Sequence, residues 1–525
     1  MSLHGDLLGE RARLTPGREA LALADGSLRL TYGELDARAN RAALALTRSL
    51  GLEKGDRVGL LAHNCVEFIE VFFAGARSGV IVVPLSTRAT VHELEAIVRD
   101  SGMRALVYGR GFAGHAAELR DRCGIEAIGG FDRAELAASS SDWRVLASSH
   151  DPAATSFPRS APEEICALLY TSGTTGKPKG VMISHRMLAW NAYNTVLNWG
   201  LREDDRSPIF TPLYHAGGLT VFLTPLFAAG GTIILHEKFD ASEVWRVMVR
   251  ERCTVALGVP TIWKLLMEAP EFETVDLSHV RWLISGGAPL PAFLIEAYRR
   301  RGVVLRQGFG MTEVGVNCFS MTSEDALLKP GSIGKAMLFT EARLVRDDGS
   351  ECGSGEVGEL HLRGPHVSSG YWNDPESTRR SFSEDGWFRT GDSARQDEDG
   401  FFYIAGRKKE MFISGGVNVY PVEIEAELLQ HAGVADAAVV GAEDPTWGEV
   451  GVAFVVAADG ATLDARELEQ WLGARLSRVK IPKRWNIVAE LPRTPYGKVE
   501  KDRLRELGDR EQPTDSKTPR LAADS

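Results

Sequence analysis

The 525-residue sequence lacks the features that define several large classes of protein. It has no Cys-x-x-Cys pair, and its cysteines are widely separated along the chain, which is untypical of a zinc site or a disulfide framework and favours a reduced, cytoplasmic compartment. Acidic residues outnumber basic ones, so the formal net charge is −11. Nucleic acid is therefore not the expected partner, since no basic excess is available for its phosphates. The cysteines are Cys65, Cys123, Cys166, Cys253, Cys318 and Cys352.

Long apolar runs are also scarce. The most apolar segment, residues 219–235, carries no charge but contains Pro225, Gly230 and Gly231, and it is shorter than the roughly 20 residues of a membrane-spanning helix. We expect a buried core element there and no membrane span. The first residues show no basic segment followed by an apolar stretch, so we expect no signal peptide.

The length and the order of sequence patterns predict a multi-lobed α/β protein. The chain exceeds one ordinary domain of about 100–200 residues, and helical patterns alternate with short β-branched strands. We predict an N-terminal domain at 1–408, with two α/β sheet subdomains and a small β-rich subdomain between 334 and 403. A composition change then predicts a compact α+β domain at 409–506 and a disordered polar tail at 507–525.

Local signals predict individual helices and strands. Thr31 and Glu34 have the spacing of a capping box, so a helix should begin there and continue to about Leu50. A second helix is predicted from about Glu67. Strands are predicted at 58–61, 80–83, 232–235, 280–285, 342–345, 358–362, 434–441 and 450–457, and further helices at 421–429 and 465–476.

The most informative segment is a loop rich in hydroxyls, glycines and lysines after an apolar run. Residues 170–180 are Tyr-Thr-Ser-Gly-Thr-Thr-Gly-Lys-Pro-Lys-Gly. Glycines let backbone N–H groups approach an anion, hydroxyls add donors, and lysines supply charge, so the loop suits a polyphosphate. It is not a Walker A loop, because Pro178 follows Lys177 and no glycine stands five residues before Gly176. A flexible surface linker is the alternative for this composition.

A second segment, Gly-Phe-Gly-Met-Thr-Glu at 308–313, combines glycines with an aromatic ring and a carboxylate. A purine could stack on Phe309, and Mg²⁺ would suit Glu313. A strand-to-helix turn with a core phenylalanine is the alternative. The nearby string Ser-Gly-Gly-Ala-Pro at 285–289 is a further glycine-rich turn.

Three later segments carry weaker signals on their own. Asp392 lies in a Thr-Gly-Asp string that suits ribose hydroxyls, but Gly-Asp is a common turn. The charged run at 406–410 precedes a glycine-containing stretch, and such a run is usually a solvated surface. Lys498 follows Pro-Tyr-Gly and should lie on a turn, where an exposed lysine is the ordinary interpretation.

Together these strings resemble the adenylate-forming superfamily, which includes acyl-CoA synthetases, firefly-type luciferases and the adenylation domains of peptide synthetases. The resemblance covers about residues 30–505, and the motifs occur in the family's order. Phe309 stands where the family has tyrosine, so stacking is retained and a hydrogen bond is lost. The resemblance implies ATP, Mg²⁺ and coenzyme A as cofactors, and a mobile C-terminal domain that rotates between two half-reactions.

The resemblance also implies roles for single residues. Lys498 is the expected catalytic lysine, which bridges the acid carboxylate and the α-phosphate, and Lys409 is the expected hinge. Asp392 and Arg407 should contact the ribose. The other expected nucleotide and CoA contacts are Thr171, Ser172, Gly173, Thr174, Thr175, Gly176, Lys179, Gly286, Gly287, Ala288, Gly308, Phe309, Gly310, Met311, Gly415 and Gly416.

Thr312, Glu313 and His215 complete the implied catalytic set, with Glu313 as the metal ligand and His215 either gating the acyl tunnel or packing. The implied acyl pocket is small or apolar in character, which suggests a bulky hydrophobic acid. Its residues are Trp190, Asn191, His215, Gly217, Gly258, Val259 and Gly286.

The branch of the family follows from the stretch around His215. Amino-acid-activating relatives carry an aspartate just after an aromatic residue, where it pairs with the substrate ammonium. Here Ala216 takes that place, and a buried unpaired ammonium would be costly. We therefore predict a stand-alone, cytoplasmic acyl-CoA ligase that acts on a carboxylic acid without an α-amine.

Other functions stay open at this point. The first alternative is an acyl-AMP ligase that loads a carrier protein instead of CoA. A luciferase-like oxygenase and a non-catalytic nucleotide-binding scaffold are more distant. Fatty, aryl, alicyclic and terpenoid acids are all compatible with the sequence, as are a monomer and a homodimer. The Ala/Arg/Gly-rich usage indicates a bacterium with a GC-rich genome.

Overall fold

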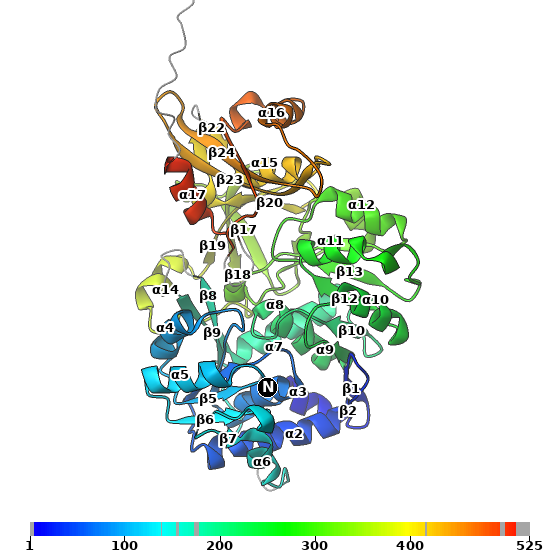
Figure 1. The fold of residues 1–525 in the computed structure, drawn as a ribbon, viewed down its shortest axis with the longest axis vertical. Helices are drawn as coiled ribbons and strands as arrows, with labels where there is room; N and C mark the ends of the chain where they lie inside the picture. The colour runs from blue at the N-terminus through cyan, green and yellow to red at the C-terminus, as the bar shows by residue number, and fades with distance from the viewer. Residues whose placement is uncertain are drawn as a thin grey trace, which may run out of the picture. The chain divides into compact units, whose positions relative to one another are not determined.

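A computed structural model of the chain describes residues 5–137, 139–153, 157–172, 178–414, 417–493 and 499–510. The chain divides into two compact units (Figure 1). Unit 1 comprises residues 1–390 and 394–404, and unit 2 comprises 391–393 and 405–525. Each unit is described by itself below.

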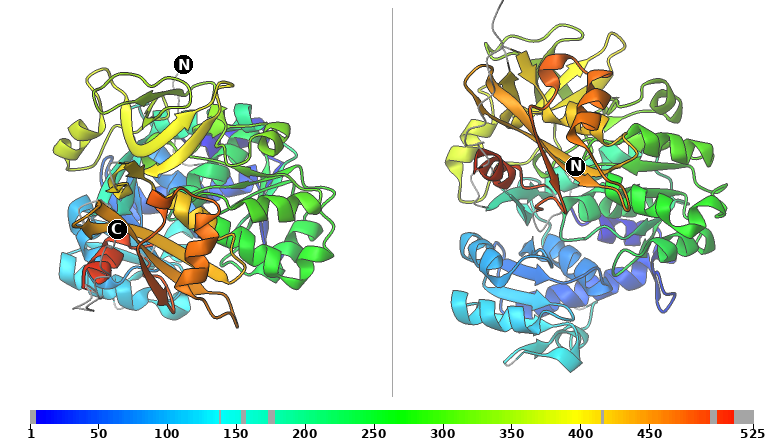
Figure 2. Two further views of the ribbon diagram at one scale, coloured as in Figure 1. Left: turned by 90° about the horizontal axis from the view of Figure 1, so that it is seen from above. Right: turned by 45° about the horizontal axis from the view of Figure 1, so that its top comes forward.

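The first part of unit 1 is built on a seven-stranded sheet with the strand order β7-β6-β5-β3-β4-β8-β9 (Figure 1). Neighbouring strands are parallel except β8 and β9, which are antiparallel. Leu94 of α4 and Leu119 of α5 share one core with Leu106 and Ile128 of the strands. Figure 2 shows this sheet and its helices from two further directions. The elements are β3 Arg57–Leu61, α3 Val66–Ser78, β4 Ile81–Pro84, α4 Val91–Ser101, β5 Ala105–Tyr108, α5 Ala113–Cys123, β6 Ala127–Gly130, β7 Ser141–Asp142, α6 Trp143–Ser148, β8 Ile165–Ser172 and β9 Pro178–Ser184.

The predicted capping box is present at the start of α2, which spans Tyr32–Leu44. The backbone N–H of Glu34 donates to Thr31 Oγ1 at 3.2 Å, and the N–H of Thr31 donates to the Glu34 carboxylate at 2.8 Å. A π-helical turn, η1, continues the helix from Ala45 to Ser49. The predicted helix is thus confirmed, because the two exchanged hydrogen bonds satisfy backbone donors that the first helical turn leaves unpaired.

Two smaller sheets complete the α/β part of unit 1. One has the order β10-β11-β1-β2, and the other is the parallel sheet β12-β13-β14. The apolar segment 219–235 forms η3, α9 and β11, and most of its side chains are buried, so the predicted core element is confirmed. The elements are α1 Leu7–Leu14, β1 Glu19–Leu23, β2 Arg29–Thr31, α7 His185–Trp199, β10 Arg206–Ile209, α8 Ala216–Gly218, η3 Leu219–Leu223, α9 Thr224–Ala229, β11 Thr232–Leu235, α10 Ala241–Arg250, β12 Val255–Gly258, α11 Pro260–Glu268, β13 Trp282–Ser285, α12 Ala292–Arg300 and β14 Leu305–Gln307.

The region predicted to be β-rich contains the sheet β17-β18-β19-β20 and the short pair β15-β16. The predicted strands at 342–345 and 358–362 are confirmed as β17 and β18. The elements are η5 Thr312–Val314, β15 Phe319–Ser320, α13 Ser323–Leu328, β16 Lys335–Ala336, β17 Glu341–Val345, β18 Val357–Arg363, α14 Pro375–Ser381, β19 Phe388–Gln396 and β20 Phe402–Arg407. Short one-turn helices also occur at η2 Arg133–Glu135 and η4 Pro270–Glu273.

Unit 2 is an α+β structure around the strand order β22-β21-β24-β23, with β25 parallel to β24. Its core joins Ile424 of α15 and Leu468 of α16 to the sheet residues Val439 and Val455. The predicted small α+β domain is thereby confirmed as a fold. The elements are η6 Lys408–Glu410, β21 Phe412–Ser414, β22 Val417–Val419, α15 Pro421–Leu428, β23 Val434–Asp444, β24 Gly448–Ala457, α16 Ala465–Gly473, η7 Arg478–Lys480, β25 Arg484–Val488 and α17 Lys501–Arg510.

One boundary predicted from the sequence needs correction. Disorder was expected from residue 507, whereas α17 continues to Arg510. Leu504 of this helix is buried against Val440 and Val452 of the sheet, which explains why the helix persists into a polar sequence. Residues 511–525 lie outside the described part of the chain.

The capping box makes a measurable contribution to the stability of unit 1. We expect Thr31→Ala to lower the free energy of unfolding by about 1 kcal/mol, because the backbone N–H of Glu34 in the first helical turn loses its acceptor. Thr31→Ser keeps the hydroxyl and should unfold like the parent protein. Urea denaturation followed by circular dichroism measures both, and equal midpoints for Thr31→Ala and the parent would contradict the expectation.

Candidate functional site

The predicted phosphate loop connects β8 and β9 in the sequence. These strands pair with Tyr170 opposite Gly180 and Thr171 opposite Lys179, so Thr171 and Lys179 lie opposite each other near the ends of the two strands. Ser172 is the last residue of β8. The predicted contacts Gly173, Thr174, Thr175 and Gly176, together with Lys177, lie outside the described residues. The antiparallel pairing therefore places one hydroxyl residue and one cation opposite each other on adjacent strands.

Lys179 belongs to a cluster that also contains Glu313. The Lys179 ammonium donates to Ser377 Oγ at 2.8 Å and lies 5.0 Å from the ring centroid of Tyr371. The Tyr371 hydroxyl donates to Glu313 Oε1 at 3.0 Å. Burial and the adjacent Glu313 carboxylate raise the pKa of Tyr371, so its hydroxyl stays protonated and keeps donating. Two residues predicted from separate motifs are thus joined through a tyrosine.

Backbone hydrogen bonds fix the segment that carries Tyr371. Met182 N donates to Gly370 O at 3.0 Å, and Trp372 N donates to Gly180 O at 2.8 Å, so this segment pairs with β9. Sequence reasoning missed Tyr371 and Ser377, because no local pattern marks a tyrosine whose partners lie in two other parts of the chain.

The turn after β14 holds Thr312 and Glu313 in a buried position. The N–H groups of Val314 and Val316 both donate to Met311 O at 3.1 Å, and Ser368 N donates to Glu313 O at 2.8 Å. A Cβ on Gly310 would lie 1.9 Å from Val316 O, so only glycine fits there.

Val316 itself has φ 68°, a left-handed conformation that is costly for a β-branched residue. The turn is therefore tightly wound and strained next to the carboxylate of Glu313. Strain of this kind persists only where surrounding contacts determine the backbone, and here Gly310 and the Met311 carbonyl supply them.

Three predicted glycines lie together at the carboxyl ends of parallel strands. Gly258 ends β12 opposite Ser285 of β13, Gly286 N donates to Gly258 O at 3.2 Å, and Gly308 N donates to Ser285 O at 2.8 Å. The carboxyl edge of a parallel sheet is the usual ligand-binding edge of an α/β fold. Gly287 is in the left-handed region at φ +80, and a Cβ there would lie 3.6 Å from Val259. The next residue of the turn is Ala288.

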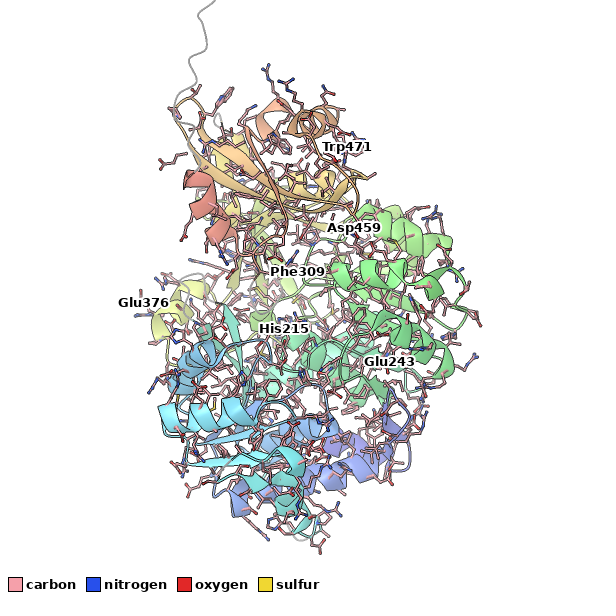
Figure 3. All side chains as sticks on the ribbon, viewed as in Figure 1. His215, Glu243, Phe309, Glu376, Asp459 and Trp471 are labelled. Atoms are coloured by element: carbon pink, nitrogen blue, oxygen red, sulfur yellow. The ribbon has the colours of Figure 1, made fainter. Side chains whose placement is uncertain are left out.

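Phe309 follows Gly308, and its half-buried ring packs edge-on against Phe319, with the ring centroids 5.7 Å apart. Figure 3 labels both Phe309 and His215 in unit 1. His215 is exposed, and its Nδ1 accepts a hydrogen bond from Gly217 N at 3.1 Å at the start of α8. Because Nδ1 is an acceptor here, the neutral ring carries its proton on Nε2.

The predicted pocket residues of α7 face different neighbours. Trp190 packs edge-on against Phe339, with centroids 4.8 Å apart. Asn191 is buried, and its Nδ2 donates to Thr220 O at 2.7 Å, just beyond α8. The structure therefore brings Asn191 toward the His215 segment and Trp190 toward a phenylalanine that sequence reasoning missed.

A buried histidine supports this part of the site. His366 Nδ1 donates to Val314 O at 2.6 Å, and Thr340 Oγ1 lies 2.8 Å from His366 Nε2. Burial lowers the pKa of His366 to about 4, so the ring is neutral near pH 7. Asn194 of α7 in turn donates to Thr340 Oγ1 at 3.1 Å. Hydrogen bonds thus connect α7 to the turn that carries Thr312 and Glu313.

The ribose-contact prediction falls in unit 2. Arg407 Nε and Asp392 Oδ1 form an ion pair at 2.7 Å, and the Asp392 side chain is only 6% exposed. Lys409, the predicted hinge, is exposed within η6. The predicted Gly415, Gly416 and Lys498 lie outside the described residues.

Comparison with known proteins gives two family matches. Residues 8–372 match the model of the AMP-binding enzymes, and residues 423–498 match that of the AMP-binding enzyme C-terminal domain. The chain is 40% identical to a feruloyl-CoA synthase of Amycolatopsis sp. over 94% of this chain and 97% of that protein. It is 38% identical to an indoleacetate–CoA ligase of Aromatoleum aromaticum over 95% and 97%. The crystal structure of ATP-bound MatB from Rhodopseudomonas palustris is similar, with a TM-score of 0.87, 33% identity, and coverage of 97% and 99%.

The tight turn at Gly310 gives a direct test of the site's geometry. Gly310→Ala should lower the free energy of unfolding by about 1–3 kcal/mol, because the new Cβ meets the Val316 backbone rather than a flexible side chain. Gly114→Ala is the matched control, since a Cβ at Gly114 meets no atom within 4 Å. Thermal denaturation of both variants checks this, and an unchanged melting temperature for Gly310→Ala would show that the turn is looser than described.

Proposed function

The chain belongs to the family of AMP-binding enzymes, as an AMP-forming acid–thiol ligase of the acyl-CoA synthetase branch, and we propose that it activates a hydrophobic aryl-bearing acid for transfer to coenzyme A. The observation that carries the proposed site is the cluster of Lys179 of β9 with Tyr371 and Glu313. It supports the proposal, because a cation and a carboxylate close together suit a nucleoside triphosphate and its metal ion.

The first half-reaction overcomes the poor leaving-group ability of a carboxylate oxygen. The acid oxygen attacks the α-phosphorus of ATP, a P–O bond forms, the bond to the β-phosphate bridge breaks, and pyrophosphate leaves. Protein groups act here by positioning and by neutralising charge. In our proposal Lys179 and Lys498 contact the phosphates, and Asp392 and Arg407 hold the ribose.

Glu313 fits the role of a magnesium ligand. Mg²⁺ is usually held by one or two carboxylates together with substrate phosphates and water, rather than by a cage of protein ligands. The described residues contain no cluster of three or more His, Cys, Asp or Glu that could hold a metal, which agrees with a site completed by ATP. The Tyr371 hydroxyl donates a hydrogen bond to Oε1 of Glu313, and this bond orients the carboxylate. The bound ion would neutralise charge on the phosphates.

In the second half-reaction the thiol sulfur of CoA attacks the acyl carbon of acyl-AMP. A C–S bond forms, the C–O bond to AMP breaks, the thiol loses its proton, and AMP leaves. We propose that unit 2 turns about Lys409 between the two steps and brings the segment around Gly415 and Gly416 to the acyl group. The exposure of Lys409 supports its use as a hinge, because few packing contacts would have to break.

Two observations support an acid of the proposed class. Ala216 leaves no carboxylate to pair with a substrate ammonium, so an amino acid is disfavoured. Feruloyl and indoleacetyl groups, which name two of the relatives, are both aryl-bearing. The remaining pocket contacts are proposed as Trp190, Asn191, His215, Gly217, Gly258, Val259 and Gly286.

We also propose a cytoplasmic location, which is supported by six cysteines that are all free. No helix in the described part of the chain is long and apolar enough to cross a membrane.

A pyrophosphate-release screen tests the proposed function. ATP, Mg²⁺ and a panel of aryl, aliphatic, alicyclic and diterpenoid acids would be assayed with and without CoA. Continuous turnover only with CoA, with acyl-CoA seen by mass spectrometry, is the expected result for aryl acids. A single burst of bound acyl-AMP that CoA does not discharge would indicate that a carrier protein, and not CoA, is the acceptor.

The two half-reactions should separate in a lysine variant. Lys498→Ala is expected to lower acyl-AMP formation by about 10²–10³-fold, because a charge contact at the reacting phosphate is lost. Conversion of supplied acyl-AMP to thioester should remain near the parent rate. Lys264→Ala, which removes a lysine 3.9 Å from Glu268 on α11, is the control. Undiminished adenylation by Lys498→Ala would remove this residue from the proposed mechanism.

A stiffened hinge should have the opposite effect. Lys409→Pro restricts the backbone at η6, so we expect adenylation to continue and thioester formation to slow. Lys409→Ala removes the side chain without restricting φ and serves as the control. Single-turnover kinetics of each half-reaction measure the effect, and equal losses in both halves would contradict a rotation about this residue.

A further inference from the structure

Asn191 of α7 combines deep burial with an unpaired acceptor. Its side chain is 1% exposed, and Oδ1 has no hydrogen-bond partner in the described part of the chain. The orientation of the amide is fixed, because Nδ2 donates to Thr220 O at 2.7 Å and only the nitrogen can donate to a carbonyl. Oδ1 is therefore directed away from Thr220. A buried acceptor without a partner is costly, by about 1–3 kcal/mol, and is uncommon in native structures.

The unpaired oxygen adjoins a small cavity in unit 1. The cavity measures about 10 Å³, close to the lower limit for one water molecule. A Cβ added to Gly315 would lie 3.2 Å from Asn191 Oδ1, so the glycine keeps this acceptor accessible. The space accommodates one donor atom. Its lining residues are Leu169, Ile183, Met187, Leu188, Asn191, Thr220, Thr312 and Gly315.

Neighbouring polar residues on the same helix face, unlike Asn191 Oδ1, are hydrogen-bonded. Asn194 donates to Thr340 Oγ1 at 3.1 Å and accepts from Asn198 Nδ2 at 2.8 Å. Thr195 donates to Asn191 O at 2.7 Å and accepts from Asn317 Nδ2 at 2.8 Å. The polar side chains of Asn194 and Thr195 are thus hydrogen-bonded, whereas Asn191 Oδ1 beside the cavity is not.

The residues around Asn191 Oδ1 connect it to the proposed binding site of the carboxylic acid substrate. Thr312, next to the proposed metal ligand Glu313, lines one side of the cavity, and Thr220 follows the segment of His215 and Gly217. The acceptor therefore lies on the side of the proposed acyl pocket that approaches Thr312 and the proposed metal ligand Glu313.

We propose that Asn191 Oδ1 is a specificity subsite for a single hydrogen-bond donor, and that the acid supplies this donor as an O–H or N–H group. The proposal rests on the proposed function. An acid with the donor pairs the buried acceptor, whereas an acid without it leaves the acceptor unpaired, and this difference produces discrimination. A buried water has the same donor chemistry and is the competing source.

Paired acids that differ only in a donor test the subsite. Cinnamate would be compared with its 2-, 3- and 4-hydroxy and 4-methoxy derivatives, using kcat/KM for CoA-dependent pyrophosphate release. The parent enzyme should prefer one hydroxycinnamate over cinnamate by about 10-fold, and methoxy, which cannot donate, should not reproduce the preference.

Variants of two asparagines assign the preference. Asn191→Leu removes the acceptor at similar volume and should reduce the hydroxyl preference to about 1. Asn194→Leu is the matched control, since it removes an equally buried but fully paired amide one turn along and should keep the ratio even if stability falls. Melting temperatures verify that both variants are folded.

A crystal structure of the parent enzyme with the preferred acid distinguishes the two donor sources. An oxygen or nitrogen of the acid within hydrogen-bond distance of Asn191 Oδ1 supports the proposal, and this readout holds if Asn191→Leu fails to fold. A water on Oδ1 with the acid elsewhere, or an unchanged ratio in Asn191→Leu, overturns it. Turnover without hydroxyl preference refutes the subsite alone, whereas no CoA-dependent turnover with any acid refutes the proposed function and the subsite with it.

Discussion

The hydrogen bond from Tyr371 to Glu313 is the contact on which the candidate site depends. Glu313 is 7% exposed, and a buried carboxylate needs donors to offset its lost hydration. Tyr371 supplies one donor, and its ring also lies beside the Lys179 ammonium. The tyrosine therefore holds an anion and a cation near each other without letting them neutralise each other directly. Both charges remain available to a ligand of mixed charge, such as a nucleotide with its metal ion.

Backbone geometry explains why this carboxylate is held so firmly. The turn from Gly310 to Val316 folds so closely on itself that a side chain at Gly310 has no room. Val316 adopts a left-handed backbone conformation within the same tight turn. His366 then donates from a neutral ring to Val314 O, so it adds no charge beside the turn that carries Glu313. Strain and a buried polar network are thus concentrated in the same few residues.

Much of the fold and several site contacts follow from local sequence signals. The capping box at Thr31, the strands of the β-rich region and the α+β unit are all confirmed, because each depends on periodicity and caps within a short window. Gly258, Gly286 and Gly308 come together because parallel strands share a carboxyl edge. Tyr371, His366 and Phe339 were missed, since their partners lie far away in the chain and no local spacing encodes them. The extension of α17 past residue 506 was missed for the same reason, because it depends on the burial of Leu504 against a sheet that is distant in the sequence.

A buried ion-pair cluster connects two distant segments within unit 2. Lys501, three residues beyond Lys498, forms ion pairs with Glu410 at 2.9 Å and with Glu425 at 2.8 Å. Arg493 and Val499, the described residues on either side of 494–498, form an isolated β-bridge. The two carboxylates raise the pKa of Lys501 despite its burial, so the ammonium stays charged, and loss of one partner would leave charge buried without compensation. The residues that follow Lys409 and those that follow Lys498 are therefore tied together within unit 2, and a rotation about Lys409 would move both as one body.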